Sequence, residues 1–248
     1  MLSKGRIKEL TSVHQKKYRS ARNKFLAEGD KLVLEAMRSK ADIREIFALE
    51  SWKGCQEAER LGIPLTLINE KELDQICELK NPKEAVAEIA MPKNVNSGRI
   101  LKGKWNIYMD RLRDPGNLGT VLRIADWFGM DQVICSPDSV EGYNQKVIQA
   151  SMGAIFRVPI ISMEAEELIA QCKANEIPMF ATAMSDKDIS GVKAGNEGLL
   201  LMGNEAQGLS EILLRAADER ISIKGKGSAE SLNVAVAAGI LMHWIYSS

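Results

Sequence analysis

Polar side chains follow a short apolar run near the C-terminus, in a place where α/β proteins commonly bind ligands. The run Leu199–Met202 is bounded by glycines and is short enough to be a strand buried on both faces. A tight polar turn follows it, made of Gly203, Asn204, Glu205 and Gly208. Ligands bind at the carboxyl ends of strands in open α/β sheets. Glu205 therefore either orders this turn by accepting backbone N–H groups or takes part in chemistry there.

A second strand is expected at Ile221–Ile223, and it leads into the glycine-rich segment Lys224–Ser228. The last helix then opens at Ser231 and is apolar almost all round. Serine is a preferred N-cap residue, so Ser231 could simply begin this helix. Asn233 is harder to explain in that way, because a buried amide needs hydrogen-bond partners. Two polar strand exits thus lie within one short segment.

A third candidate is Arg123, in the helix that we expect over Leu118–Phe128. The apolar residues of this helix recur at helical spacing and predict a buried stripe. Arg123 follows Leu118 by five positions, so at ~100° per residue it points away from that stripe. A surface salt bridge and a ligand contact both remain open for it. Asn117 has two interpretations as well, since asparagine is a preferred N-cap and could also contact a substrate.

Common catalytic and nucleotide-binding patterns are absent from the sequence. His14 and His243 are its only histidines, and neither has the acidic, serine or cysteine neighbours of a triad. There is no GxxxxGK(S/T) segment, and the chain reads DRLRDPGNLG where a dinucleotide fold would have GxGxxG. The four cysteines form no Cys-x-x-Cys pair, which indicates neither a zinc site nor a disulfide framework.

The composition is that of a folded cytoplasmic protein. Of 248 residues, 45% are apolar and 27% are charged, and the length suits one large or two ordinary domains. No stretch reaches the ~18 uninterrupted apolar residues of a membrane-spanning helix. The start, MLSKGRIKEL, lacks the apolar core of a signal peptide. Together with the unpaired cysteines, this favours the reducing cytoplasm.

A net charge of zero conceals a basic amino end. Residues 1–40 contain eleven Lys/Arg and four Asp/Glu, a balance of +7, which leaves −7 for the remainder. Lys and Arg bind nucleic acid by displacing counterions from its phosphates. This end is therefore a candidate phosphate-binding face, although an ordinary solvated helix surface would carry the same charges.

Short apolar runs alternate with helical patterns along the whole chain, which predicts an α/β protein. Up to about residue 90 we expect a small α/β domain, in which Asp30 caps a helix that ends near Lys40. A polar segment rich in Pro, Gly and Lys follows, and we place the domain boundary near Asn96. The second domain, 97–248, should hold a mostly parallel sheet covered on both faces. Its other strands are expected at Trp105–Asp110, Gln132–Ser136, Arg157–Ile161 and Met179–Thr182.

Three motifs occur in the order DPGNLGTVLRIADWFG, LLLMGNEAQGLS and ISIKGKGSAESLNVAVAAG. They resemble the three motifs of the SpoU/TrmH family of SPOUT-class RNA ribose 2'-O-methyltransferases, and the likeness covers about residues 105–246. The earlier segment KYRSARNKFLAEGDKLVLEAM resembles the small L30e-like substrate-binding domain that often precedes the catalytic one. Each motif alone is moderately specific, but three in this order are not expected by chance.

The resemblance implies a fold that composition could not indicate. The carboxyl end of the α/β sheet would thread through a loop as a deep trefoil knot, which is nearly absent among other proteins. The knot would form a pocket for S-adenosylmethionine, and no metal would be required. Backbone groups of Gly203, Ile223 and Leu232 would hold this cofactor, while Met202 and Ile221 would line the pocket.

The resemblance also implies roles for the polar residues. Arg123 matches the arginine of the first motif, supplied across a homodimer interface to activate the ribose 2'-hydroxyl or to hold the adjacent phosphate. Phosphate binding is easier to defend, because guanidinium has a pKa above ~12 and binds phosphate bidentately. The other residues expected at the reaction centre are Asn117, Glu205, Ser231 and Asn233.

We therefore expect a two-domain enzyme that methylates a ribose 2'-oxygen in RNA, with ribosomal RNA favoured over transfer RNA by the extra amino-terminal domain. The alternative from another class of function is an RNA-binding assembly factor that has no catalytic activity. A dinucleotide-dependent enzyme is a third alternative, but this sequence lacks the glycine fingerprint of such enzymes. The apolar last helix predicts a homodimer contact. One departure from the family is Lys224-Gly225-Lys226 after Ile223, where Pro-Met is common, and it makes this loop more basic and less constrained.

Overall fold

The computed structural model describes residues 1–79, 84–92, 98–183 and 187–247, and they form two compact units. The first unit is Met1–Lys93 with Glu141–Arg157, and the second is Asn94–Val140 with Val158–Ser248. The boundary expected at Asn96 lies outside the described residues. That the segment 141–157 belongs with the first unit was not anticipated, and the division into 1–96 and 97–248 stays a prediction.

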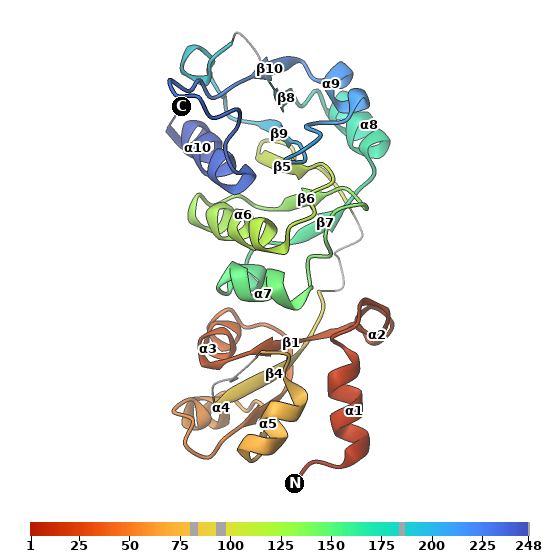
Figure 1. Ribbon diagram of the computed structural model, residues 1–248, viewed down its shortest axis with the longest axis vertical. Helices are drawn as coiled ribbons and strands as arrows, with labels where there is room; N and C mark the ends of the chain where they lie inside the picture. The colour runs from red at the N-terminus through yellow and green to blue at the C-terminus, as the bar shows by residue number, and fades with distance from the viewer. Residues whose placement is uncertain (80–83, 93–97, 184–186, 248) are drawn as a thin grey trace. The chain divides into compact units, whose positions relative to one another are not determined.

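The first unit contains a four-stranded sheet of order β1-β4-β2-β3 in its described part. Figure 1 labels β1 and β4 of this sheet. The β2–β3 pair is parallel and the other pairs are antiparallel. Its strands are β1 (Lys24–Glu28), β2 (Ile43–Ala48), β3 (Leu65–Leu67) and β4 (Ala85–Ala90). Its helices are α1 (Lys4–Ser12), α2 (Lys16–Arg22), α3 (Asp30–Arg38), α4 (Cys55–Arg60), α5 (Glu70–Ile76), α7 (Gln145–Ser151) and the short 3-10 turn η1 (Ala154–Phe156). The expected small α/β domain is confirmed.

The start of α3 differs from the prediction, because Asp30 does not cap it. Gly29 holds the N-cap position with φ 97°, a conformation that favours glycine. Asp30 is instead the first helical residue, where a carboxylate is stabilised by the positive end of the helix dipole. The helix therefore begins where the glycine permits the chain to turn.

The basic amino end is partly neutralised by neighbouring acids. Glu88 is almost fully buried and pairs with Arg6 at 2.9 Å and with Lys24 at 3.2 Å. Further ion pairs engage Arg19, Arg22 and Arg38. The cationic face of this unit is consequently smaller than the count of Lys and Arg in the sequence suggested.

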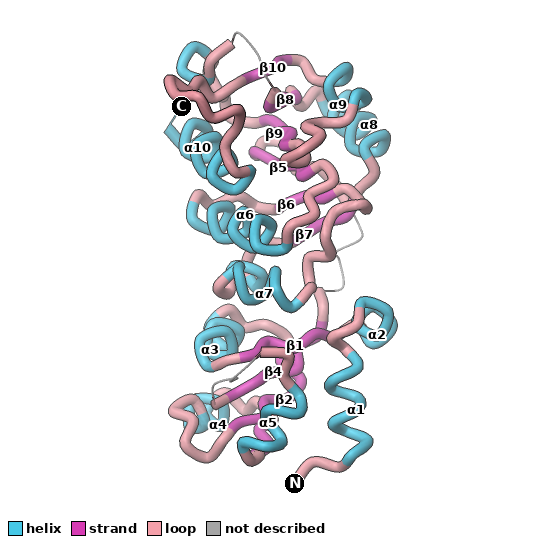
Figure 2. The backbone as a smooth tube through the Cα atoms, in the orientation of Figure 1, coloured by secondary structure: helices cyan, strands magenta, loops and turns pink. Residues whose placement is uncertain are grey.

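The second unit is built on a parallel sheet of order β10-β8-β9-β5-β6-β7. Figure 1 shows α6 and α10 on one side of this sheet and α8 and α9 on the other, and Figure 2 shows the strands between them. Its strands are β5 (Trp105–Met109), β6 (Val133–Cys135), β7 (Ile160–Ser162), β8 (Met179–Thr182), β9 (Gly198–Met202) and β10 (Glu219–Ile221). Its helices are α6 (Pro115–Trp127), α8 (Ala165–Asn175), α9 (Glu211–Ala216), α10 (Val234–Ser247) and the 3-10 turn η2 (Ile189–Gly191). The predicted parallel α/β sheet is confirmed.

Burial explains the position of the central strands. Every residue of β5 and β9 is buried, as expected for parallel strands that helices cover on both faces. The strand β5 pairs with β6 on one side and with β9 on the other. After β5 the chain adds β6 and β7 on one side, and the later strands β8, β9 and β10 lie on the other side. Open α/β sheets bind ligands at such a switch point in strand order.

Two strand predictions were displaced. The strand β7 begins at Ile160 rather than Arg157, because residues 154–156 form a 3-10 turn. The strand β10 ends at Ile221, and Ser222 makes only an isolated bridge to Asp188. Ile223 thus lies beyond the strand rather than within it.

The chain beyond β10 is held against the loop that follows β8. The backbone N–H of Lys224 donates to Oδ2 of Asp188 at 3.0 Å. The indole Nε1 of Trp244, in α10, donates to the carbonyl of Val192 at 3.0 Å. One loop therefore contacts both the exit of β10 and the last helix. Such contacts suit a chain end drawn through this loop, and the trefoil threading itself stays a prediction.

A buried polar cluster fixes the amino end of the sheet. The side chain of Asn106 is fully buried. Its Oδ1 accepts hydrogen bonds from the Leu101 N–H at 3.2 Å and from Gln132 Nε2 at 2.8 Å. Its Nδ2 donates to the Leu101 carbonyl at 3.0 Å. This one amide joins β5, the segment before it and the start of β6.

We expect Asn106→Ala to lower the free energy of unfolding by about 3 kcal/mol, because it leaves the Leu101 N–H and the Gln132 amide without their partner. Urea unfolding followed by tryptophan fluorescence measures the change, since Trp105, Trp127 and Trp244 all lie in this unit. Lys102→Ala, at an exposed position in the same region, serves as the control and should leave the midpoint unchanged. Equal midpoints for the two variants would contradict the proposed role of this amide.

Candidate active site

A cavity of about 290 Å³ opens at the carboxyl ends of β8, β9 and β10. It is lined by Thr182, Ala183, Met202, Gly203, Asn204, Glu205, Gly208, Ile221, Ser222, Ile223, Glu230, Ser231, Leu232, Val234, Ala237 and Leu241. All five residues expected to hold a cofactor lie on this wall, together with Glu205 and Ser231 of the expected reaction centre. Sequence reasoning missed Thr182 and Ala183, although the strand-exit rule applied to β8 would have found them.

The turn after β9 folds directly over its own strand exit. The Asn204 N–H donates to the Gly208 carbonyl at 3.1 Å, and the Gly208 N–H donates to the Asn204 carbonyl at 2.8 Å. A Cβ added to Gly203 would lie 2.3 Å from the backbone of Gly208 and Leu209. Only glycine therefore fits at this position, and the backbone itself forms that part of the cavity wall.

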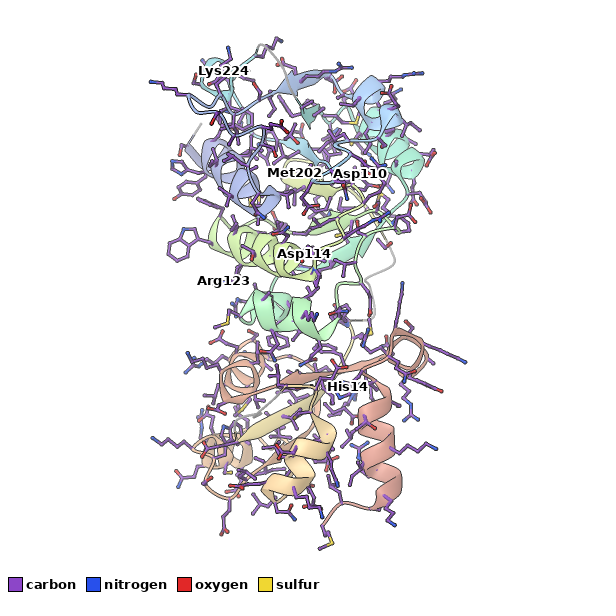
Figure 3. All side chains as sticks on the ribbon, viewed as in Figure 1. His14, Asp110, Asp114, Arg123, Met202 and Lys224 are labelled. Carbon is purple, nitrogen blue, oxygen red and sulfur yellow. The ribbon has the colours of Figure 1, made fainter. Side chains whose placement is uncertain are left out.

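The exit of β5 holds this turn in place. Asp110 Oδ2 accepts a hydrogen bond from the Ser210 N–H at 2.7 Å. The next residue, Arg111, has a left-handed backbone with φ 56° and donates to Gln207 Oε1 at 2.9 Å and to the Gly208 carbonyl at 3.2 Å. Figure 3 labels Asp110 and Met202 at the exits of these neighbouring strands. Sequence reasoning did not single out Arg111, because its partners lie almost a hundred residues away.

Asn117 is not the N-cap of α6, contrary to one interpretation of the sequence. Asp114 occupies that position, and its Oδ1 accepts from the Asn117 N–H at 2.7 Å. The side chain of Asn117 is consequently available for other contacts. Its Nδ2 donates to Glu205 Oε1 at 2.7 Å, and its Oδ1 accepts from Asn233 Nδ2 at 3.0 Å. Residues from three separate motifs thus form one hydrogen-bonded chain, Glu205–Asn117–Asn233.

The last helix begins later than the sequence indicated, at Val234 rather than Ser231. Asn233 provides the reason, because its Oδ1 accepts from the Ala235 N–H at 3.0 Å and from the Val236 N–H at 3.3 Å, as an N-cap side chain does. Asn233 is exposed, so the need of a buried amide for partners does not explain its presence here. Ser231 precedes the helix and lines the cavity.

Arg123 is exposed on α6, as its position off the apolar stripe predicted. Figure 3 labels it beside this helix. It makes no hydrogen bond or ion pair with any other residue that the structure describes, so the salt-bridge explanation finds no partner among those residues. It does not line the cavity either. Trp127, one turn further along α6, is 84% exposed and gives this face an apolar character.

Other chemistries find little support in the described residues. Cys135 and Cys172 are buried, and burial raises the pKa of each thiol to about 12, so neither provides a thiolate nucleophile at neutral pH. No three His, Cys, Asp or Glu side chains of the described part gather as metal ligands would. Within the same ranges, every helix is too short or too polar to cross a membrane.

Two family models match the chain. The model of the SpoU rRNA Methylase family matches residues 104–243, which is more than half of the chain. The model of the MRM3-like substrate binding domain matches residues 4–87. The second match falls within the first unit, and the first match includes all five residues of the expected reaction centre.

Named relatives and solved structures resemble the chain over nearly its whole length. The 23S rRNA (guanosine(2553)-2'-O)-methyltransferase RlmP of Bacillus subtilis is 29% identical over 239 residues, 96% of this chain and 94% of the relative. An rRNA methyltransferase from Sinorhizobium meliloti, solved with bound AdoMet, has a TM-score of 0.87 at 29% identity and covers 100% of this chain and 96% of its own. The AviRb methyltransferase of Streptomyces viridochromogenes has a TM-score of 0.88, covers 99% of this chain and 98% of its own, and at 24% identity supports the fold alone.

We expect Gly203→Ala to destabilise the second unit, because the new Cβ would force the turn backbone away from β9. Overpacking of this kind costs about 2 kcal/mol, which lowers the Tm by roughly 4–8 °C in a chain of this length. Differential scanning calorimetry measures the shift. Gly225→Ala is a matched control, since a Cβ there meets nothing within 4 Å. A Tm that is the same for both variants would show that the turn does not need its glycine.

Proposed function

The chain belongs to the SpoU rRNA methylase family, and we propose that it transfers a methyl group from S-adenosylmethionine to a ribose 2'-hydroxyl of ribosomal RNA. The observation that carries this proposal is the cavity at the strand exits, which is lined by all five predicted cofactor residues and by Glu205 of the hydrogen-bonded chain. The full-length likeness to a named 23S rRNA 2'-O-methyltransferase supports ribosomal RNA as the substrate.

The cavity fits the chemistry of the cofactor. Met202, Ile221 and Leu241 give it apolar walls, while the exits of β9 and β10 contribute backbone amides and carbonyls at Gly203 and Ile223. Adenine is recognised by a few such polar groups within an apolar pocket. The close approach of Gly203 to Gly208 keeps this side of the cavity free of side chains. A cofactor related to a nucleoside is therefore accommodated by this set of residues.

When bound, S-adenosylmethionine supplies an activated methyl group on a positively charged sulfur. The residues of this chain must then align the ribose oxygen with that methyl group and remove the proton of the ribose 2'-hydroxyl. A bond forms from the oxygen to the methyl carbon as the carbon–sulfur bond breaks. Alignment and proton removal are thus the two tasks for which side chains are needed.

The chain Glu205–Asn117–Asn233 is suited to the second task. Asn117 occupies Oε1 of Glu205 at 2.7 Å, and within the described residues no hydrogen bond engages Oε2. That oxygen can accept a hydrogen bond from the ribose hydroxyl and take up its proton as the oxygen–carbon bond forms. Asn117 and Asn233 act through Glu205, because they fix the carboxylate relative to the start of α10. Ser231 lines the same cavity and offers a further hydroxyl to the substrate.

Arg123 acts on the substrate phosphate in this proposal, and it does so at the site of a second copy. Its guanidinium has no hydrogen-bond or ion-pair partner among the described residues of its own chain. On α6 and α10 it is accompanied by the exposed apolar residues Trp127, Val236 and Ile240. An exposed apolar patch of this kind commonly marks an interface. A homodimer through α6 and α10 would cover these residues and bring Arg123 to the partner's cavity.

We expect Arg123→Ala to lower methyl transfer about a hundredfold, since the charged contact to the phosphate that positions the reacting ribose is lost. The assay is tritium transfer from labelled S-adenosylmethionine to ribosomal RNA that lacks the modification. Arg215→Ala, an exposed arginine on α9, is the matched control and should retain activity. Undiminished transfer by Arg123→Ala would remove this arginine from the mechanism.

Complementation tests whether Arg123 acts across a dimer. Co-expressed Arg123→Ala and Glu205→Gln subunits should recover about a quarter of the wild-type activity, because half of the randomly formed dimers contain one intact site. Separate tags on the two subunits isolate the mixed dimers. Recovery should be absent if both residues must belong to the same chain.

We expect Asn117→Ala to reduce kcat more than it raises KM, because it releases Glu205 without removing a substrate contact. Steady-state methylation of ribosomal RNA gives both constants. Calorimetry with S-adenosylhomocysteine should show unchanged affinity in this variant. Absence of binding by the wild-type protein would favour an RNA-binding assembly factor instead, and a rise in KM alone in Asn117→Ala would place Asn117 in substrate binding.

A further inference from the structure

The first unit holds a cavity of its own, of about 290 Å³. Three aromatic rings adjoin there, with centroids 5.0 Å apart for Phe25 and Tyr143 and 6.3 Å apart for Phe25 and Phe156. The full lining is Asn23, Phe25, Ala41, Asp42, Arg44, Ile89, Ala90, Met91, Pro92, Tyr143, Ile155 and Phe156. Elements of the small α/β sheet and the segment 141–157 thus enclose an aromatic hollow, which the methyl-transfer chemistry does not use.

The hydroxyl of Tyr143 is the most informative group in this cavity. The residue is only 4% exposed, yet no described residue makes a hydrogen bond with its hydroxyl. The hydroxyl oxygen is not among the fully enclosed polar atoms of the described residues that lack a partner, so it is open to the cavity it lines. Burial, and then the charge of Glu141, raises the pKa of Tyr143, so the hydroxyl stays protonated and able to donate at neutral pH. A ligand that enters the cavity can therefore accept a hydrogen bond from this hydroxyl.

Polar groups surround the mouth of the cavity. Asn23 is exposed with a left-handed backbone, φ 52°, and its Nδ2 donates to the Met91 carbonyl at 3.2 Å. Arg44 and Asp42 form an exposed ion pair at 2.8 Å. An amide, a carboxylate and a guanidinium thus stand around an aromatic floor. Unpaired RNA bases are bound by this combination, through stacking on aromatic rings and hydrogen bonds to their edges.

The segment that carries Tyr143 is firmly attached to the rest of the unit. Arg19 is 4% exposed, donates to the Val13 carbonyl at 2.8 Å and forms an ion pair with Glu141. Gln149 Nε2 donates to the Glu28 carbonyl at 2.9 Å, which ties α7 to β1. The cavity wall is therefore formed before any ligand arrives, and binding needs little ordering of the protein.

We propose that this cavity binds one unpaired nucleobase of the RNA substrate, stacked on the ring of Phe156 and hydrogen-bonded through its edge to the Tyr143 hydroxyl. The inference rests on the proposed function, and it specifies how the first unit would select the RNA. Bases in a duplex cannot enter such a hollow, so the recognised RNA presents a splayed base in a loop or bulge. A cavity of about 290 Å³ admits a single base.

Fluorescence anisotropy with short labelled single-stranded RNAs tests the proposal on the full-length protein. The probes are four RNAs that differ only in their central base and a fifth that is abasic there. At least one of the four RNAs should bind more tightly than the abasic RNA. Tyr143→Phe should lower the affinity for this preferred RNA about three- to tenfold and leave the affinity for the abasic RNA unchanged. Tyr18→Phe, at a tyrosine on α2 that is 39% exposed, is the matched control and should change nothing. Equal affinity of all five probes, or no effect of Tyr143→Phe, overturns the inference.

A second variant tests the stacking surface. Phe156→Leu keeps an apolar side chain but removes the ring. It should lower the affinity for the preferred RNA about tenfold or more. Photocrosslinking of the same probe with 4-thiouridine at the central position should label Tyr143 or Phe156 in peptide mass spectra. Crosslinks confined to other parts of the chain would contradict the proposal.

The inference and the proposed function fail in different ways. Calorimetry with S-adenosylhomocysteine and methylation of ribosomal RNA are measured on the same wild-type protein and on Tyr143→Phe. If the wild-type protein binds no S-adenosylhomocysteine but the base preference depends on Tyr143, the methyltransferase proposal fails and the base site stands. If methylation proceeds with the same KM in Tyr143→Phe and the probes bind equally, only the base site is refuted.

Discussion

The closeness of two backbone segments at the exit of β9 determines the geometry of the site. Gly203 approaches Gly208 and Leu209 so nearly that no side chain fits between them. The turn therefore folds back on its strand, and Glu205 projects from it towards Asn117 at the start of α6. A wider turn would carry the carboxylate away from that amide. The cavity wall and the polar chain beside it thus depend on the same contact.

The polar groups of the site contribute little to holding the fold together. Glu205 and Asn233 are exposed, and hydrogen bonds of this kind stabilise a protein by only about 1 kcal/mol each. The fully buried strands β5 and β9 supply the rigid support instead. The side chains at the strand exits can consequently be arranged for chemistry, because the stability of the sheet does not depend on them.

The proposed functions assign methyl transfer to the second unit and base recognition to the first. The exits of parallel strands offer backbone amides and carbonyls around an apolar hollow, which suits a small cofactor. The aromatic cavity of the first unit, with the Tyr143 hydroxyl, instead suits a base from a larger substrate. Its segment 141–157 is an insertion between β6 and β7, so the catalytic sheet itself supplies part of the recognition unit.

The sequence by itself determined the alternation of strands and helices, the parallel sheet and the outward direction of Arg123, because local periodicity records which residues are buried. The resemblance to the SpoU/TrmH family also named residues that line the cavity, namely Met202, Gly203, Ile221, Ile223 and Leu232. Tertiary structure alone decided that Asp114 rather than Asn117 caps α6, that Asn233 begins α10, and that 141–157 joins the first unit. The side chain of Asn117 reaches residues 88 and 116 positions away. Contacts at such separations leave no periodic trace in a single sequence, so the hydrogen-bonded chain and the Tyr143 cavity emerge only once the fold brings their parts together.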